Sequence, residues 1–166
     1  MRIHGVIGTV GGVGYITPAP GTWGSAAAVP LAWVLHTLGS WPLLLLGIAL
    51  VIPLGVWAIG GMTRGRAEHD PSEAVIDEVA GQWIALLPVS FGASFTGADV
   101  VALWPGWVTA FAFFRLFDIM KPGPVGYFDR QRTPLSTVLD DVVAGVFAAL
   151  TVIGLAAIYH FILAWF

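Results

Sequence analysis

The sequence predicts an all-α membrane protein: a polytopic helical bundle of about four to five membrane-embedded helices, with a glycine- and proline-rich N-terminal segment. The first observation is composition, because 57% of the residues are hydrophobic, only 10% are charged and the mean hydropathy is +0.85. Soluble domains carry nearer to about 25% charged residues. The second is that apolar runs of roughly the 20 residues needed to span a bilayer are separated by short segments with glycine, proline or charged residues. A length of 166 residues fits one domain, 1–166.

The first three expected helices follow from apolar runs and their boundaries. The first covers about 25–38, which is short for a span, so this helix could be tilted or partly re-entrant. The second, about 42–61, is long enough to cross. The third follows an Asp-Pro pair, with Ser72 as the expected N-cap, and runs to about residue 91.

The last two helices complete an alternating path through the membrane. The fourth covers about 99–120 and is stopped by the KPGP segment that begins at Lys121, because proline cannot continue a helix. The fifth starts near residue 135 or 136 and continues to the end. This threading places the N-terminal segment, the 62–72 loop and the 121–134 loop on one side.

Basic residues are confined to that side. Arg115 lies about one turn inside the fourth helix, and the others fall in the three segments just named: Arg2, Arg64, Arg66, Lys121, Arg130 and Arg132. Membrane proteins keep Lys and Arg on the cytoplasmic side. The charge asymmetry therefore predicts that the N-terminal side is cytoplasmic.

Five carboxylates lie at a similar shallow depth on the same side: Asp77, Glu78, Asp118, Asp140 and Asp141. The pair in the third helix is expected five or six residues inside it, about 8 Å along the axis. A charge within a spanning helix costs several kcal/mol unless it is paired or faces a polar cavity. A divalent cation would relieve this cost and the mutual repulsion, and hard oxygen ligands suit Mg²⁺. The alternative is that each acid reaches the headgroups or pairs with a neighbouring base.

Two further groups are candidates to bind an anion. Arg115 and Lys121 lie three residues either side of Asp118 and would add positive charge at the same rim. Thr22 and Ser25 stand at a helix entry after a glycine-rich stretch, where backbone N–H groups and the helix dipole favour phosphate oxygens. A plain surface loop with Ser25 as an ordinary N-cap is the alternative.

Small and polar neighbours of the acids point to close packing. Gln82 lies one turn after Glu78, where it could form a hydrogen bond with Glu78 or with a polar group of a neighbouring helix. Gly81 and Gly145 follow the two acidic pairs, and small residues there would let two helices approach closely and bring the pairs together. Close packing without a functional role explains the glycines equally well.

Several classes of function are disfavoured. There is no cysteine, which removes disulfides, thiolate metal sites and cysteine nucleophiles. The four histidines are far apart and have no zinc-ligand spacing. Seven basic residues spread along the chain form no basic patch, so no nucleic acid partner is expected.

Four stretches resemble the phosphatidylglycerophosphatase A family: GYITPAPGTWGS (14–25), DPSEAVIDEVAGQWIAL (70–86), FRLFDIMKPGP (114–124) and LDDVVAG (139–145). The resemblance implies a Mg²⁺-dependent phosphatase of bacterial phospholipid synthesis. It would remove the terminal phosphate of phosphatidylglycerophosphate, giving phosphatidylglycerol and inorganic phosphate. A multi-pass protein of the inner (cytoplasmic) membrane, with its active site facing the cytoplasm, is then expected.

In the resulting hypothesis, Asp77, Glu78, Asp118, Asp140 and Asp141 supply metal ligands, directly or through water. A carboxylate left over orients the attacking water, Arg115 and Lys121 neutralise developing charge, and Thr22 and Ser25 bind phosphate oxygens. The catalytic set is accordingly Asp77, Glu78, Asp118, Asp141, Arg115 and Lys121. An aspartyl-phosphate intermediate stays open.

Two other classes of function compete with the phosphatase. A small ion or proton transporter would use the acids as a pathway, but such acids should be distributed through the bilayer depth. A non-catalytic lipid-binding or assembly protein would give no reason for both adjacent acidic pairs.

Overall fold

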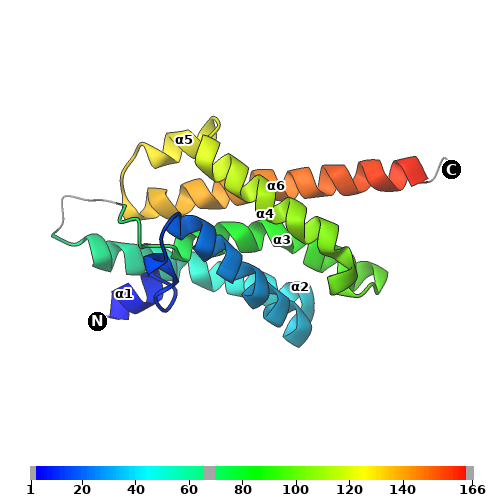
Figure 1. Cartoon of the computed structure of the whole chain (residues 1–166), viewed down its shortest axis with the longest axis horizontal. Coiled ribbons are helices and arrows are strands. Elements are labelled where there is room, and N and C mark those ends of the chain that lie inside the picture. Colours follow the sequence, from blue (N-terminus) through cyan, green and yellow to red (C-terminus); the bar gives the residue numbers. More distant parts are fainter. Residues whose placement is uncertain (1–2, 66–69, 164–166) are drawn as a thin grey trace.

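The computed structural model describes residues 3–65 and 70–163, and within these ranges all regular structure is helical (Figure 1), which confirms the all-α prediction. Among these residues, four helical stretches are long and apolar enough to cross a membrane: Pro20–Thr63, Ile76–Thr96, Val100–Met120 and Pro134–Ile162. The elements are α1 (Ile3–Gly8), η1 (Val13–Tyr15), α2 (Pro20–Thr63), α3 (Ile76–Thr96), η2 (Val100–Leu103), α4 (Trp104–Met120), α5 (Pro124–Asp129) and α6 (Pro134–Leu163).

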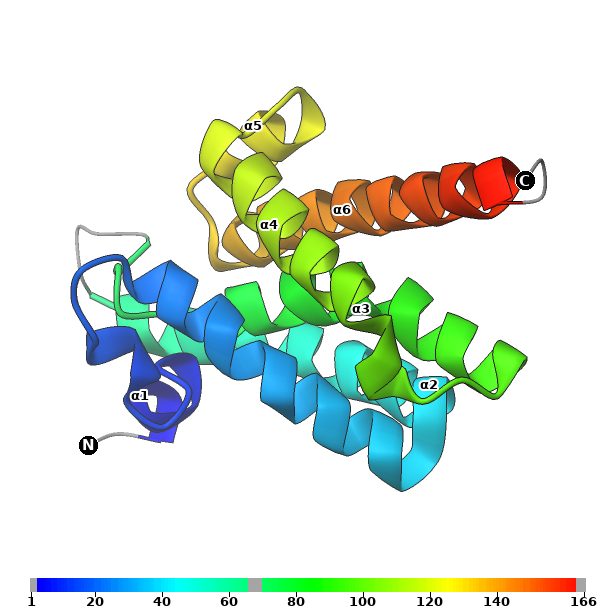
Figure 2. The same cartoon turned by 45° about the vertical axis from the view of Figure 1, so that its right-hand side comes forward.

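Helix α2 contains the first two predicted helices, separated by a sharp break. Gly39 (φ −160°, ψ 21°) and Ser40 (φ 56°, ψ −159°) leave helical geometry, and the chain doubles back there (Figure 2). The first arm begins at Pro20 rather than near residue 25, because proline is well suited to the first helical position, where no N–H is needed. The added turn makes this arm about 28 Å long at 1.5 Å per residue. Its length is therefore enough for a span.

Helix α3 begins later than predicted, at Ile76. Its N-cap is Val75, without a side-chain cap, so the prediction of Ser72 as N-cap is wrong. A distant contact holds the preceding loop, because the Val75 N–H donates to the carbonyl of Gly8 at 2.8 Å. Asp77 and Glu78 consequently lie in the first turn of α3, not five or six residues inside it. Acidic side chains are stabilised in that position by the helix dipole.

The remaining helices follow the predicted path, with one addition. Asp99 caps η2 by accepting the Val101 N–H at 2.9 Å. Lys121, with φ 48° and ψ 54°, ends α4 as the KPGP segment predicts. The short helix α5 in the following loop is not predicted by the sequence pattern.

The loops segregate to two ends of the bundle as the threading predicts. Helix α1, the end of α2 and helix α5 lie toward one end in Figure 1, whereas the α2 break, the turn before α4 and the last turns of α6 lie toward the other. The basic loop residues Arg64, Lys121, Arg130 and Arg132 belong to the first group of segments. Arg2 and Arg66, also predicted on this side, lie outside the described residues.

Helices α3 and α6 cross in direct backbone contact. A Cβ on Gly145 would lie 2.4 Å from the Gly81 carbonyl oxygen, and a Cβ on Gly81 would lie 2.6 Å from the Asp141 carbonyl oxygen. Phe114 of α4, fully buried, closes the same junction. The predicted close approach of the two helices is confirmed, and it brings their acidic pairs together.

Candidate active site

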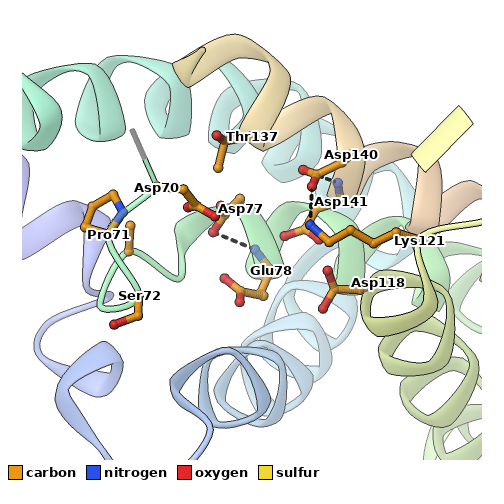
Figure 3. A pocket seen from close by; sticks show the side chains of 11 residues that line it. Asp70, Pro71, Ser72, Asp77, Glu78, Asp118, Lys121, Thr137, Asp140 and Asp141 are labelled. Carbon is orange, nitrogen blue, oxygen red and sulfur yellow. Dashed lines mark hydrogen bonds and ion pairs between the residues drawn. The ribbon is translucent and has the colours of Figure 1, made fainter. Parts of the chain in front are cut away.

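A polar pocket of about 90 Å³ lies at the end of the bundle that carries α5 (Figure 3). It contains all five carboxylates singled out from the sequence, so their predicted convergence is confirmed. Its lining residues are Asp70, Pro71, Ser72, Ala74, Asp77, Glu78, Asp118, Lys121, Thr137, Asp140 and Asp141.

Three of these carboxylates form a tight group. Asp77, Glu78 and Asp141 each offer an oxygen within 4.8 Å of the others. Asp77 is 5% exposed and Asp141 is 4% exposed. Glu78 Oε2 is buried and has no hydrogen-bond partner in the part of the chain that the structure describes. Buried like charges at this spacing repel one another, and a hard divalent cation with oxygen ligands would offset that repulsion.

Backbone hydrogen bonds orient two of the acids. The Glu78 N–H donates to Asp77 Oδ1 at 3.1 Å, and the Asp141 N–H donates to Asp140 Oδ1 at 3.0 Å. Each acidic pair thus uses its second residue's amide to hold the carboxylate of its first. Because the two acids of each pair are adjacent in the sequence, the N–H of the second can reach the carboxylate of the first.

Both predicted cations form ion pairs with the acids. Arg115 Nη1 donates to Asp118 Oδ2 at 2.5 Å. Lys121 lines the pocket and donates to Asp129 and, at 2.9 Å, to Asp140 Oδ2. Burial lowers the pKa of the Lys121 ammonium, but these hydrogen bonds outweigh burial and raise its pKa above the ordinary value. Lys121 therefore keeps its positive charge at the pocket wall throughout the neutral range.

The N-terminal segment reaches the site through Gly21. A Cβ there would lie 2.1 Å from Glu78 Oε1 and 3.3 Å from Arg115 Nη1. Thr22 is half-buried beside it, whereas Ser25 is fully buried and donates its hydroxyl to the Gly21 carbonyl at 2.9 Å. Because Ala19 is the N-cap of α2, the alternative of Ser25 as an N-cap is wrong.

The roles of Thr22 and Ser25 in phosphate binding stay predictions. Neither is among the described residues that line the pocket. The segment that contains them nevertheless lies directly against Glu78 and Arg115, as the contacts of Gly21 show.

Sequence reasoning missed three polar residues of this region. Thr137 lies on α6 three and four residues before the acidic pair, a helical spacing that could have identified it. Asp70 lies in the same stretch of sequence as Asp77, where the Asp-Pro pair indicates only a helix boundary. Asp129 pairs with Lys121 because α5 carries it there, and α5 had no clear signal in the sequence.

The close approach of Gly21 predicts that a single methyl group disturbs the site. For the phosphatase reaction that the sequence resemblance implies, Gly21→Ala should lower the rate by up to about 10²-fold, because its Cβ would displace Glu78 and misplacement by about 1 Å can have that effect. Steady-state kinetics on the purified variant measure this. Gly60→Ala in the same helix is the matched control, since its Cβ would meet Pro134 at an ordinary 3.7 Å. Equal rates for both variants would contradict the placement of Gly21.

Comparison with known proteins indicates the family of the chain. The family model described as Phosphatidylglycerophosphatase A matches residues 6–156. A Phosphatidylglycerophosphatase A of Haemophilus influenzae is 36% identical over 143 residues, covering 85% of this chain and 81% of the relative. One of Escherichia coli is 36% identical over 140 residues, with 83% and 74% coverage. A Putative phosphatidylinositol-3-phosphatase of Bacteroides thetaiotaomicron is 35% identical over 148 residues, with 86% and 87% coverage.

No solved structure matches the chain significantly. The family model nevertheless covers every residue that lines the pocket, both acidic pairs included. The chain is a membrane-associated phosphatase and belongs to the phosphatidylglycerophosphatase A family.

Proposed function

We propose that this protein hydrolyses the terminal phosphate of phosphatidylglycerophosphate in a Mg²⁺-dependent reaction that yields phosphatidylglycerol and inorganic phosphate. The observation that carries the proposal is the group of three carboxylates, Asp77, Glu78 and Asp141, with oxygens within 4.8 Å. Their pocket opens at one end of long apolar helices. A lipid whose acyl chains stay in the bilayer would present its phosphate at this level. The names of two relatives support the choice of lipid.

The donor set fits Mg²⁺. Asp77, Glu78 and Asp141 would hold the ion, with Asp118 and Asp140 beside them as ligands through water, since Mg²⁺ prefers oxygen ligands and keeps several waters. Glu78 would offer one carboxylate oxygen to the ion, as its oxygen within 4.8 Å of those of Asp77 and Asp141 allows. When bound, the ion would supply positive charge to the phosphoryl oxygens and lower the pKa of water.

The chain's own side chains would complete a direct hydrolysis. A bond forms between the water oxygen and phosphorus, and the bond from phosphorus to the glycerol oxygen breaks. Asp118, whose side chain is 15% exposed at the pocket wall, accepts the proton that water loses and returns it to the glycerol oxygen. Lys121 and Arg115 offset the negative charge that develops on the phosphoryl group.

An aspartyl-phosphate route would instead form a covalent bond from one of these carboxylates to phosphorus. Rapid quenching during turnover with radiolabelled substrate distinguishes the two routes. Direct attack by water predicts no acid-stable, base-labile label on the protein, and such a label would contradict it.

Membrane orientation follows the same proposal. The site would lie on the cytoplasmic side of the bacterial inner membrane, because Lys and Arg are enriched on that side of membrane proteins. The segments around the pocket contain the basic residues of the described loops: Arg64, Lys121, Arg130 and Arg132. The transporter alternative is disfavoured because the acids gather in one pocket at one end of the helices instead of following the membrane depth.

Metal removal tests the proposed function directly. Purified protein in detergent should release phosphate from phosphatidylglycerophosphate with Mg²⁺ and lose nearly all activity in EDTA, with recovery on adding excess Mg²⁺. Phosphatidylinositol 3-phosphate, tested in parallel because of one relative's name, should be a poorer substrate. Phosphate release that is unaffected by EDTA would contradict the proposed Mg²⁺ dependence. Phosphate release from the inositol lipid alone would contradict phosphatidylglycerophosphate as the substrate. No release from either lipid would favour the alternative function as a transporter.

A further inference from the structure

Gln82 is a polar side chain whose position packing does not explain. It is fully buried in α3, and within the described ranges neither its amide nitrogen nor its amide oxygen has a hydrogen-bond partner. Its helix neighbours Ala85 and Leu86 belong to the apolar core. A buried polar group without a partner costs about 1–3 kcal/mol. An apolar side chain of the same length would avoid that cost.

A complementary atom lies one helical turn away. Glu78 and Gln82 are four residues apart on α3, a spacing that puts their side chains on one face and within reach of each other. Glu78 Oε2 is an acceptor without a partner, and Gln82 Nε2 is a donor without a partner. The spacing of four residues on one helix allows a hydrogen bond between these two side chains.

The two carboxylate oxygens of Glu78 differ in their surroundings. The Oε1 atom lies against Gly21 of α2, where a Cβ would be 2.1 Å from it. The Oε2 atom is buried and has no hydrogen-bond partner among the described residues. No hydrogen bond to Oε2 therefore fixes the orientation of this carboxylate.

We propose that Gln82 is a positioning residue: its amide donates to Glu78 and fixes that carboxylate in the orientation that binds the divalent cation together with Asp77 and Asp141. This inference rests on the metal site proposed above. Groups that orient metal ligands typically contribute about 10- to 100-fold to metal affinity. Gln82 would thus be retained at a cost in stability because it improves cation binding.

A purely structural role makes the opposite prediction for stability. If Gln82 served as interhelical glue, its removal would lower the unfolding temperature and leave cation binding unchanged. If it is a positioning residue, removal should leave the metal-free protein equally or more stable, because its amide atoms are unpaired there.

Thermal unfolding of the full chain in detergent, titrated with MgCl₂, separates these cases without measuring activity. Gln82→Met should unfold without metal at the wild-type temperature or above, yet need about 10- to 100-fold more Mg²⁺ for half-maximal stabilisation. Ser90→Ala is the matched control on the same helix, because it removes a buried hydroxyl that is 2.7 Å from His36 Nδ1. It should lower the unfolding temperature and keep the wild-type Mg²⁺ dependence.

The outcomes are distinct. An unchanged Mg²⁺ dependence in Gln82→Met would overturn the positioning role while leaving the metal site intact. Failure of Gln82→Met to fold would also overturn it, since the amide would then be needed for the fold. If Mg²⁺ does not stabilise even the wild type, the metal site fails and this inference fails with it.

Discussion

Asp77→Asn is expected to reduce kcat/KM for phosphatidylglycerophosphate by about 10³-fold, the upper range for loss of one electrostatic contact to a reacting group. Asp77 is one of three carboxylates whose oxygens lie within 4.8 Å, and asparagine removes its charge with almost no change in shape. The side-chain oxygen of asparagine can still accept the Glu78 N–H, so the start of α3 should be preserved. Phosphate release at saturating Mg²⁺, with thermal unfolding of the same sample, measures both effects.

Asp99→Asn is the matched control for this charge removal. Asp99 is exposed at the N-cap of η2, and asparagine is an equally good cap. Its activity and stability should equal those of the wild type. An Asp77→Asn protein that retains more than about a tenth of wild-type activity would contradict a central role for this carboxylate, because loss of such a contact should cost well over tenfold.

Gly145→Leu is expected to have the largest effect on stability. Even its Cβ would lie 2.4 Å from the Gly81 carbonyl oxygen, which belongs to backbone and cannot turn away. Overpacking costs about 1–3 kcal/mol, and each kcal/mol lowers the unfolding temperature of a protein of this size by about 2–4 °C. Activity should fall as well, because separation of α3 from α6 moves Asp77 and Glu78 away from Asp141.

The control for helix packing is Gly154→Leu on the same helix. Apart from its own helix, no described residue has an atom within 4 Å of a Cβ there, so unfolding temperature and activity should stay at wild-type values. Differential scanning fluorimetry and phosphate release on the two leucine variants test the contrast. Similar unfolding temperatures for both would contradict the close crossing of α3 and α6.

Much of the helical architecture could be predicted because it depends on local properties of the chain. Apolar length defines the spans, proline and glycine mark their ends, and alternating threading places acids and bases at one end. The start of α3 could not be predicted in this way. It depends on the Val75 N–H reaching the Gly8 carbonyl, a contact between segments far apart in the sequence.

The candidate site shows the same division. The convergence of the five acids could be predicted from their similar depth in the helices. The close helix approach at Gly81 and Gly145 could be predicted from the positions of these glycines after the acidic pairs. The partners of Lys121 could not, because Asp129 reaches it only through α5. Nor could the confinement of Glu78 by Gly21, because the sequence does not show which face of the first arm of α2 meets α3.

Binding of Mn²⁺, followed by electron paramagnetic resonance, tests the central claim most directly, because Mn²⁺ prefers the same oxygen ligands as Mg²⁺ and is visible without turnover. The three-carboxylate site predicts saturable Mn²⁺ binding to the purified wild type, competition by Mg²⁺, and its loss in both Asp77→Asn and Asp141→Asn, with binding retained in Asp99→Asn. Wild-type protein that binds no Mn²⁺, or binding that survives in both site variants, would contradict a divalent-cation site built from α3 and α6.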